Sequence, residues 1–134
     1  MKKLFLLLAV AMFAFACERG DNLEMRSYNV TVHANQWQQV TDGPIRFFSS
    51  TVSFPEITPF IFNNGTVLAY VRDGNNKQDI LPRVRHLGDG SDAWTSTIDC
   101  TIAPGSITFF YTNSDFVYQN SEPGRQDFRV VLQW

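Results

Sequence analysis

The chain has 134 residues, of which 44% are hydrophobic, and a formal net charge of −2 at pH 7. This length is enough for one domain of ordinary size and too short for two. The acidic balance argues against nucleic-acid binding, which depends on Lys and Arg contacts to phosphate.

The first 16 residues have the pattern of a bacterial export signal. Lys2 and Lys3 precede thirteen consecutive apolar residues, 4–16, as the charged segment of a signal peptide precedes its apolar segment. This apolar run is too short to cross a bilayer, which takes about 20 residues. We therefore predict that residues 1–16 are a lipoprotein signal peptide.

Cys17 lies where such a signal ends. Ala14 and Ala16 are small residues like those of the lipobox that precedes the lipidated cysteine of bacterial lipoproteins, although Phe15 is bulkier than the usual residue. We predict acyl chains on the sulfur and the amino group of Cys17. More than one chain would anchor the protein stably, because burial contributes about 0.8 kcal/mol per CH₂. Ordinary secretion with cleavage after Ala16 is the rival interpretation.

Loss of the signal would leave nine basic and thirteen acidic residues, so the mature chain would be more acidic than the full one. With Cys17 acylated, Cys100 would be the only free thiol, which excludes an intramolecular disulfide. Residues 17–26 are polar and rich in charge, and we predict that they form a lipidated tether. The folded domain is then expected over 27–134.

Residues 27–134 alternate apolar and polar side chains in short runs separated by turn signals. About seven short strands in this pattern predict an all-β fold, a single antiparallel β-sandwich. The predicted strands are 28–33, 48–54, 67–71, 80–87, 94–102, 106–112 and 128–134. Helix is expected only as a turn within 56–62, where Pro59 should limit its length.

Three short segments predict turns. Ala103-Pro104-Gly105-Ser106 has proline and glycine where a type II turn needs a fixed φ and then a positive φ. It should therefore close a hairpin between strands 94–102 and 106–112. Asn64-Gly65 and Asp73-Gly74 lie between apolar runs and are turn signals of the same kind.

Candidate reactive residues are few. Cys100 shares strand parity with Ile98 and Ile102, so we predict a core position in which the thiol acts as a small hydrophobic group and not as a nucleophile. His33 and His86 fall in separate predicted strands without other ligands at zinc spacing. Hydrolase and phosphate-loop motifs are absent from the sequence. We therefore predict a protein that is not an enzyme and that needs no cofactor.

Two loops place oxygen side chains around a glycine, as calcium loops do: Asp89-Gly90-Ser91-Asp92 and Asp73-Gly74-Asn75-Asn76. Ordinary hairpin loops have the same composition, and the EF-hand spacing with its closing glutamate is missing. Solvated turns are the favoured interpretation. Asp89 and Asp92 are the weak calcium candidates.

Aromatic residues offer a second kind of site. Strand parity places Trp134 with apolar residues 128, 130 and 132, and Trp94 with Ile98, so both tryptophans are predicted to be core residues. Trp37 lies in a polar stretch and is expected to face solvent. Trp37, Tyr111 and Tyr118 are therefore the candidates for stacking on sugar rings, and packing in a small core is the alternative.

Arginines alternate along the predicted strand 80–87. Arg83 and Arg85 share one face, and Arg72 is expected across a hairpin from them, so an anion site is conceivable. Pairing of these arginines with Asp79 or Asp99 across strands is the favoured interpretation, because opposite charges on a solvated sheet face are common.

The chain resembles small exported lipoproteins of unknown function from Bacteroidota-type Gram-negative bacteria. The similar segments are Met1-Lys2-Lys3, Cys17 with residues 18–21, 55–58, 64–70, 81–86 and 128–134. None of them is a catalytic signature, and the short collagen-like Gly-Pro repeats that relatives can carry are absent, since the tether has only Gly20. The resemblance implies the outer membrane, because Glu18 replaces the aspartate that commonly retains lipoproteins in the inner membrane.

Together these patterns predict a non-enzymatic cell-envelope lipoprotein that acts as a structural or protein-interaction module. The alternative is a glycan-binding β-sandwich at the cell surface. Its partners would be the membrane, through the lipid on Cys17, and either an envelope protein or a glycan. The periplasmic and surface-facing orientations are both left open by the sequence.

Overall fold

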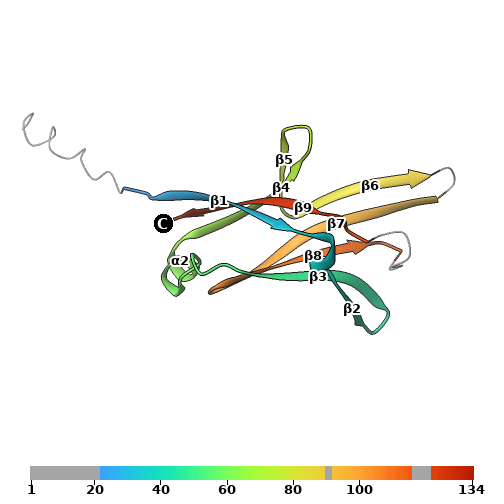
Figure 1. Ribbon diagram of the computed structural model, residues 1–134, viewed down its shortest axis with the longest axis horizontal. Helices are drawn as coiled ribbons and strands as arrows, with labels where there is room; N and C mark the ends of the chain where they lie inside the picture. The colour runs from blue at the N-terminus through green and yellow to red at the C-terminus, as the bar shows by residue number, and fades with distance from the viewer. Residues whose placement is uncertain (1–21, 90–91, 116–121) are drawn as a thin grey trace, which may run out of the picture.

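The computed structural model describes residues 22–89, 92–115 and 122–134. Two antiparallel sheets pack together as a β-sandwich, as the sequence predicts (Figure 1). Its elements are β1 (Met25–Val32), the 3₁₀ helix η1 (Ala34–Gln36), β2 (Gln38–Asp42), β3 (Ile45–Ser53), α2 (Pro59–Asn64), β4 (Thr66–Asp73), β5 (Lys77–Ile80), β6 (Arg83–Asp89), β7 (Asp92–Ala103), β8 (Ser106–Asn113) and β9 (Gln126–Gln133).

The strand order is β1-β9-β4-β5 in the four-stranded sheet and β2-β3-β8-β7-β6 in the five-stranded sheet. The chain changes sheet after β1, β3, β5 and β8, so each sheet is assembled from separate stretches of sequence. β9 lies at the centre of the smaller sheet, between β1 and β4. β9, the last strand of the chain, therefore connects β1 to β4 within this sheet.

The structure has two strands that the sequence analysis missed. β2 contains one apolar residue, Val40, so alternation is not visible in its sequence, yet it pairs with β3 through a two-residue loop at Gly43 and Pro44. The predicted strand 80–87 is in fact the end of β5 and most of β6, which belong to different sheets. The chain passes between the sheets at Leu81-Pro82, where proline lacks the N–H that a continuous strand would use.

The predicted hairpin at Ala103–Ser106 is confirmed, since β7 and β8 pair up to the residues that flank Pro104 and Gly105. Gly105 has a φ of 79°, the positive value that a type II turn requires at that position. The Gly105 N–H donates to the Ile57 carbonyl at 2.8 Å, so the turn is also tied to the segment before α2. A local signal and a tertiary contact thus fix the same turn.

The single α-helix within the described residues, α2, begins at the residue that was expected to limit it. Pro59 occupies the first turn of α2, where its missing N–H has no helical partner to lose. Thr58 caps this end, its hydroxyl oxygen accepting from the Ile61 N–H at 3.2 Å. Gly65 ends the helix, and a Cβ there would lie 2.7 Å from the Gln133 carbonyl oxygen, so only glycine allows this approach to β9.

The core lies between the two sheets and is built around stacked aromatic rings. Phe109 of β8 and Phe128 of β9 stack with centroids 3.9 Å apart and an interplanar angle of 13°, and neither is exposed. Because these strands belong to different sheets, this contact joins the two layers. The other fully buried large side chains around it are Val32, Ile57, Val71, Ile98, Ile107, Val130 and Leu132.

Strand structure begins within the range expected for the tether. The backbone of Glu24 exchanges two hydrogen bonds with Trp134, at 2.8 and 3.0 Å, and β1 follows from Met25. The start of β1, the C-terminus and α2 lie at the same end of the sandwich (Figure 1). We call this end the anchor end, because residues 17–21 precede it in sequence.

Phe128→Ala is expected to lower the free energy of unfolding by about 3–5 kcal/mol, because it removes one ring of a buried stack and leaves a cavity between the sheets. Chemical denaturation of the two proteins measures this loss. Thr101→Ala, at an exposed position on the outer face of β7, is the control and should change stability by about 0.5 kcal/mol or less. A loss below about 1 kcal/mol for Phe128→Ala would contradict the central role of the stack.

Candidate functional site

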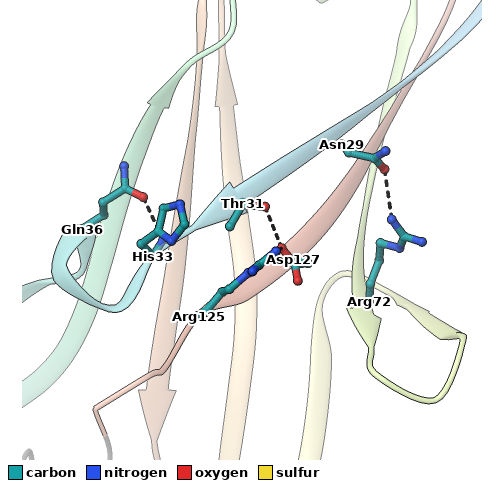
Figure 2. A network of polar contacts seen from close by, with 7 residues as sticks. All are labelled: Asn29, Thr31, His33, Gln36, Arg72, Arg125 and Asp127. Carbon is teal, nitrogen blue, oxygen red and sulfur yellow. Dashed lines mark hydrogen bonds and ion pairs between the residues drawn. The ribbon is translucent and has the colours of Figure 1, made fainter.

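A cleft of about 470 Å³ lies at one end of the four-stranded sheet, where the β4–β5 turn, β1 and the start of β9 border it. Its polar lining comes from β1, from the region of the β4–β5 turn and from the start of β9. The lining side chains used below are Asn29, Thr31, Arg72, Arg125 and Asp127 (Figure 2). We call this feature the polar cleft.

Asp127 is the centre of the polar cleft. The Thr31 hydroxyl donates to Asp127 Oδ1 at 2.6 Å, and Arg125 donates to the same oxygen from Nε at 3.2 Å and from Nη2 at 3.1 Å (Figure 2). The hydrogen bond from Thr31 and the nearby guanidinium of Arg125 lower the pKa of the Asp127 carboxyl below its ordinary value. The carboxylate is therefore held in its charged form.

Arg72 lies on the other side of this carboxylate. β9 places Asp127 between Thr31 of β1 and Arg72 of β4, directly across the strands. The positive charge of Arg72 also contributes to the lowered pKa of Asp127, while its Nη1 donates to Asn29 Oδ1 at 3.3 Å. Arg72 thus has the neutral side chain of Asn29 as its hydrogen-bond partner. Because Arg72 is exposed, its other N–H groups can donate to a ligand.

The alternation of strands explains why these polar groups meet on one face. In β1, β4 and β9 the residues between the buried valines and phenylalanine point away from the core. The arrangement can donate and accept hydrogen bonds, as a saccharide or a carboxylate would require. Two carboxylates line the cleft: Asp127 is stabilised in the ionised form, and Asp73 is paired with Arg85. Neither is therefore arranged as a general acid.

Arginines and aspartates also pair between the two sheets. Arg85 Nη2 lies 3.3 Å from Asp73 Oδ2 and 3.7 Å from Asp79 Oδ2, and Arg83 Nη1 lies 3.8 Å from Asp79 Oδ2. The predicted pairing with Asp79 is confirmed, although it connects β6 of one sheet to β4 and β5 of the other. Arg72 is not across a hairpin from these arginines, since it lies on the outer face of the four-stranded sheet.

Asp99 makes no such pair. Its Oδ1 is buried without a hydrogen-bond partner on the outer face of β7, opposite Phe110 of β8. Burial raises the pKa of this carboxyl. Of the two partners that the sequence offered for the arginines, Asp79 is therefore used and Asp99 is not, because Ile98 and Asp99 point to opposite faces and Arg83 lies opposite Ile98.

Cys100 packs against the hydrophobic core, as predicted from its parity. Burial, with a smaller contribution from the charge of Asp99, raises the pKa of its thiol to about 11. Such a thiol is protonated at neutral pH and is a poor nucleophile. This environment fits the predicted role as a small hydrophobic group.

The histidines lie far apart in the fold. His33 precedes η1, where its backbone N–H donates to Gln36 Oε1 at 2.8 Å (Figure 2). His86 is on β6, with its Nδ1 3.2 Å from the Thr95 hydroxyl. Among the side chains that the structure describes, no three His, Cys, Asp or Glu residues are grouped as metal ligands.

The weak calcium candidate falls at the edge of the described chain. Asp89 and Asp92 are paired at the ends of β6 and β7, while residues 90 and 91 between them, and the side chains of both aspartates, lie outside the described residues. The second loop, at Asp73, forms the predicted turn between β4 and β5, with Asn76 at a φ of 62°. Asp73 there accepts from the Asn75 N–H and pairs with Arg85.

Trp37 is the clearest correction to the sequence analysis. It was expected to face solvent, yet only 9% of it is exposed, and its Nε1 donates to the Gly124 carbonyl at 3.3 Å. Trp37 follows η1, and this short helix turns the side chain inward although its sequence neighbours are polar. It borders a hollow of about 310 Å³ together with Phe48.

The other aromatic candidates do not form a platform with it. Tyr111 is half-buried and packs edge-on against Phe48, with centroids 6.5 Å apart. Tyr118 lies outside the described residues. Trp134 packs against the core as predicted, but half-buried Trp94 does not belong to it, because the β6–β7 hairpin extends past the other sheet (Figure 1).

The sequence analysis did not identify the residues of the polar cleft as a site. They come from three strands that are distant in sequence, and each is an ordinary polar residue on the solvent side of an alternating run. The alternation of apolar and polar residues in each strand predicts that these residues lie on outer faces. It does not predict the order of the strands, which brings Thr31, Asp127 and Arg72 together.

Comparisons of the chain with protein-family models, with curated proteins and with solved structures gave no match in any of the three. Within residues 22–89, 92–115 and 122–134, no helix has the length and hydrophobicity needed to cross a membrane. Functional inference therefore depends on the chemistry of the sequence and on the surfaces of the sandwich.

The polar cleft predicts a specific dependence of stability on acid. Because the pKa of Asp127 is lower in the folded than in the unfolded chain, its stabilising effect is complete above the unfolded pKa of about 4 and is lost as the pH falls through the folded value. Asp127→Asn should remove this part of the pH dependence. Urea denaturation of both proteins between about pH 6 and pH 2 measures it.

Thr31→Val is the matched variant for this experiment, because it keeps the carboxylate and removes the first cause of its lowered pKa. It should shift the loss of stability toward higher pH. Parallel curves of unfolding free energy against pH for all three proteins would show that Asp127 is not held in this way.

Proposed function

We propose that this chain is a non-enzymatic lipoprotein of the bacterial outer membrane that binds another envelope protein. The proposed anchor is the acylated Cys17, and the proposed binding surface is the free edge of β6. The observation that carries the binding proposal is an edge strand of seven residues with exposed apolar side chains.

β6 has the chemistry of a strand that accepts a partner. Among the described residues it pairs with β7 along one side and with no strand along the other, which leaves backbone N–H and C=O groups at the edge. Val84 and Leu87 on this strand are 53% and 39% exposed. Added strands gain affinity from main-chain hydrogen bonds and specificity from alternate side chains.

The other sheet edges are less suited to this role. β2 and β5 have only five and four residues, and the exposed side chains of β2 are polar. β1 is longer, but Val30 and Val32 are buried and Thr31 is engaged with Asp127. On β6 the charges that commonly protect an edge, Arg83 and Arg85, are turned toward aspartates of the other sheet.

The reactive side chains that the structure describes are in environments that oppose catalysis, which agrees with a non-enzymatic role. The described thiol, Cys100, is packed against the core with a raised pKa, and the Asp127 carboxylate of the polar cleft is stabilised as an anion. Both environments oppose the nucleophilic and general-acid chemistry that these groups could otherwise supply. Binding is therefore favoured over turnover.

Glycan binding is the second candidate function. The structure favours the polar cleft for it over the aromatic residues suggested by the sequence. The stacking platform of Trp37, Tyr111 and Tyr118 loses support because Trp37 is buried and Tyr111 packs on Phe48. The polar cleft, with exposed Arg72, is the remaining place for a saccharide. Retention of the wild type on a carbohydrate array, lost in Arg72→Ala, would favour this candidate over the interaction module.

The anchor is tested by replacing the acylated residue. Cys17→Ala should abolish labelling by an alkyne fatty acid and should release the protein from the membrane fraction, because no acyl chain can then be attached. Labelling is measured on gels of the labelled cells, and Cys100→Ala is the control that should remain labelled. Continued labelling of Cys17→Ala would contradict lipidation at this residue.

The binding edge is tested by photo-crosslinking in the native envelope. A photoreactive residue in place of Leu87 should give an adduct with a specific protein, whereas the same residue in place of Thr101 on β7 should not. Val84→Lys should prevent the adduct, because a charge on the edge opposes addition of a strand. Since Val84 is exposed, this change should alter stability by about 0.5 kcal/mol or less.

The pattern of adducts decides between the outcomes. Equal adducts from positions 87 and 101, or an adduct that persists in Val84→Lys, would exclude β6 as the binding edge. Circular dichroism of Val84→Lys verifies that a lost adduct does not result from unfolding.

A further inference from the structure

We propose that the anchor end of the sandwich docks directly on the lipid surface, with the side chains of Leu23, Met25, Phe60 and Phe62 in the interfacial region. This inference rests on the proposed lipidation of Cys17. It adds a second contact with the membrane and a fixed orientation of the domain, neither of which follows from lipidation alone.

Exposed apolar side chains are concentrated at the anchor end. Met25, Leu23 and Phe60 are 68%, 66% and 62% exposed, the three highest values among the large apolar residues that the structure describes, and Phe62 is 44% exposed. Phe60 and Phe62 flank Ile61, which is the buried residue of α2. The helix thus uses one side chain to hold itself on the core and presents two aromatic rings outward.

The residues around these four side chains suit an interface between water and lipid. Trp134 lies beside Phe60 around a shallow hollow, and the guanidinium of Arg26 lies over the Trp134 ring, 5.5 Å from its centroid. Tryptophan and arginine are common at the headgroup level, where an apolar or aromatic body and a polar end are both accommodated.

The short tether is the reason to propose the lipid surface, and not a protein, as the partner of the anchor end. Leu23 is the sixth residue after Cys17, so even a fully extended chain of about 3.3–3.6 Å per residue places it within about 20 Å of the acylated residue. The chain is already fixed to the sheet from Glu24 by the two hydrogen bonds with Trp134. The apolar side chains therefore cannot move far from the bilayer that holds the acyl chains.

The sandwich is long compared with the tether, so the orientation of the domain decides which of its ends lies near the membrane. β7 has 12 residues and spans about 40 Å at about 3.3 Å per residue, roughly twice the reach of the tether. The β2–β3 hairpin lies at the end opposite α2 (Figure 1). Docking would bury the exposed apolar side chains of the near end and direct the opposite end away from the membrane.

The experiment uses the full acylated protein in vesicles of phosphatidylcholine and phosphatidylglycerol. In a Cys100→Ala background, Phe62→Cys is labelled with the environment-sensitive fluorophore NBD, since Cys17 is blocked by acylation. Ile45→Cys is the matched control, because Ile45 is a similarly exposed apolar residue, at 42%, on the β2–β3 hairpin. Quenching by lipids that carry a nitroxide in the upper acyl chain reports the depth of each label.

We expect severalfold stronger quenching and a blue-shifted emission for the label at position 62 compared with position 45. Flotation of the vesicles is measured on the same samples. Protein that floats but shows equal, weak quenching at both positions overturns the docking and leaves the lipid anchor intact. Protein that does not float overturns the anchor itself and the docking with it.

Two further outcomes at position 62 are possible: a blue shift without quenching, and a variant that does not fold. A blue shift at position 62 without quenching by the nitroxide lipid would mean that protein covers this end, for example a second copy, and would overturn the proposal. If Phe62→Cys fails to fold, as judged by thermal unfolding, Met25→Cys replaces it, because Met25 is the most exposed of the four residues and begins an edge strand.

Discussion

The stack of Phe109 on Phe128 is the contact on which the rest of this structure depends. It joins the centre of one sheet to the centre of the other, and both rings are fully buried. Each sheet has one apolar face that water would otherwise contact, so neither layer is stable without the other. β9, which lies between β1 and β4, carries Phe128 opposite Phe109 of the other sheet. The alternation of the strands then directs the intervening side chains to the outer faces of the two sheets.

The polar groups reinforce this layering at its margins. The row of Thr31, Asp127 and Arg72 connects three strands of the smaller sheet on the outer face. Arg83 and Arg85 pair with aspartates of the other sheet, so they connect the rims of the two layers. These ion pairs are partly exposed, and pairs of this kind contribute only about 0–1 kcal/mol each. They define the register and direction of the edges more than they stabilise the fold, whose stability comes from the core.

The two proposals use different surfaces of the same sandwich and are compatible. The anchor end carries the most exposed apolar side chains, close in sequence to Cys17, where lipidation is proposed, whereas β6 leads away from this end and extends past the other sheet (Figure 1). A domain held on the membrane by its anchor end would present the open edge of β6 to neighbouring proteins in the envelope. Pre-orientation lowers the entropy that a partner must overcome on binding. The polar cleft lies on another face and would be accessible in the same orientation.

Sequence alone determined what depends on neighbouring residues: the alternation that predicts half-buried strands and the turn at Pro104-Gly105. The export signal that ends at Cys17 is likewise predicted from neighbouring residues alone. Tertiary structure decided which strands pair and which side chains are covered. Trp37 was misjudged because polar neighbours say nothing about Gly124, which is distant in sequence and accepts its indole N–H. β2 was missed because its pairing with β3, and not its own composition, makes it a strand. The polar cleft could not be predicted because its residues come from strands that are distant in sequence. Contacts between such strands form only when the two sheets pack on their common core, whereas a sequence pattern reports only neighbouring residues.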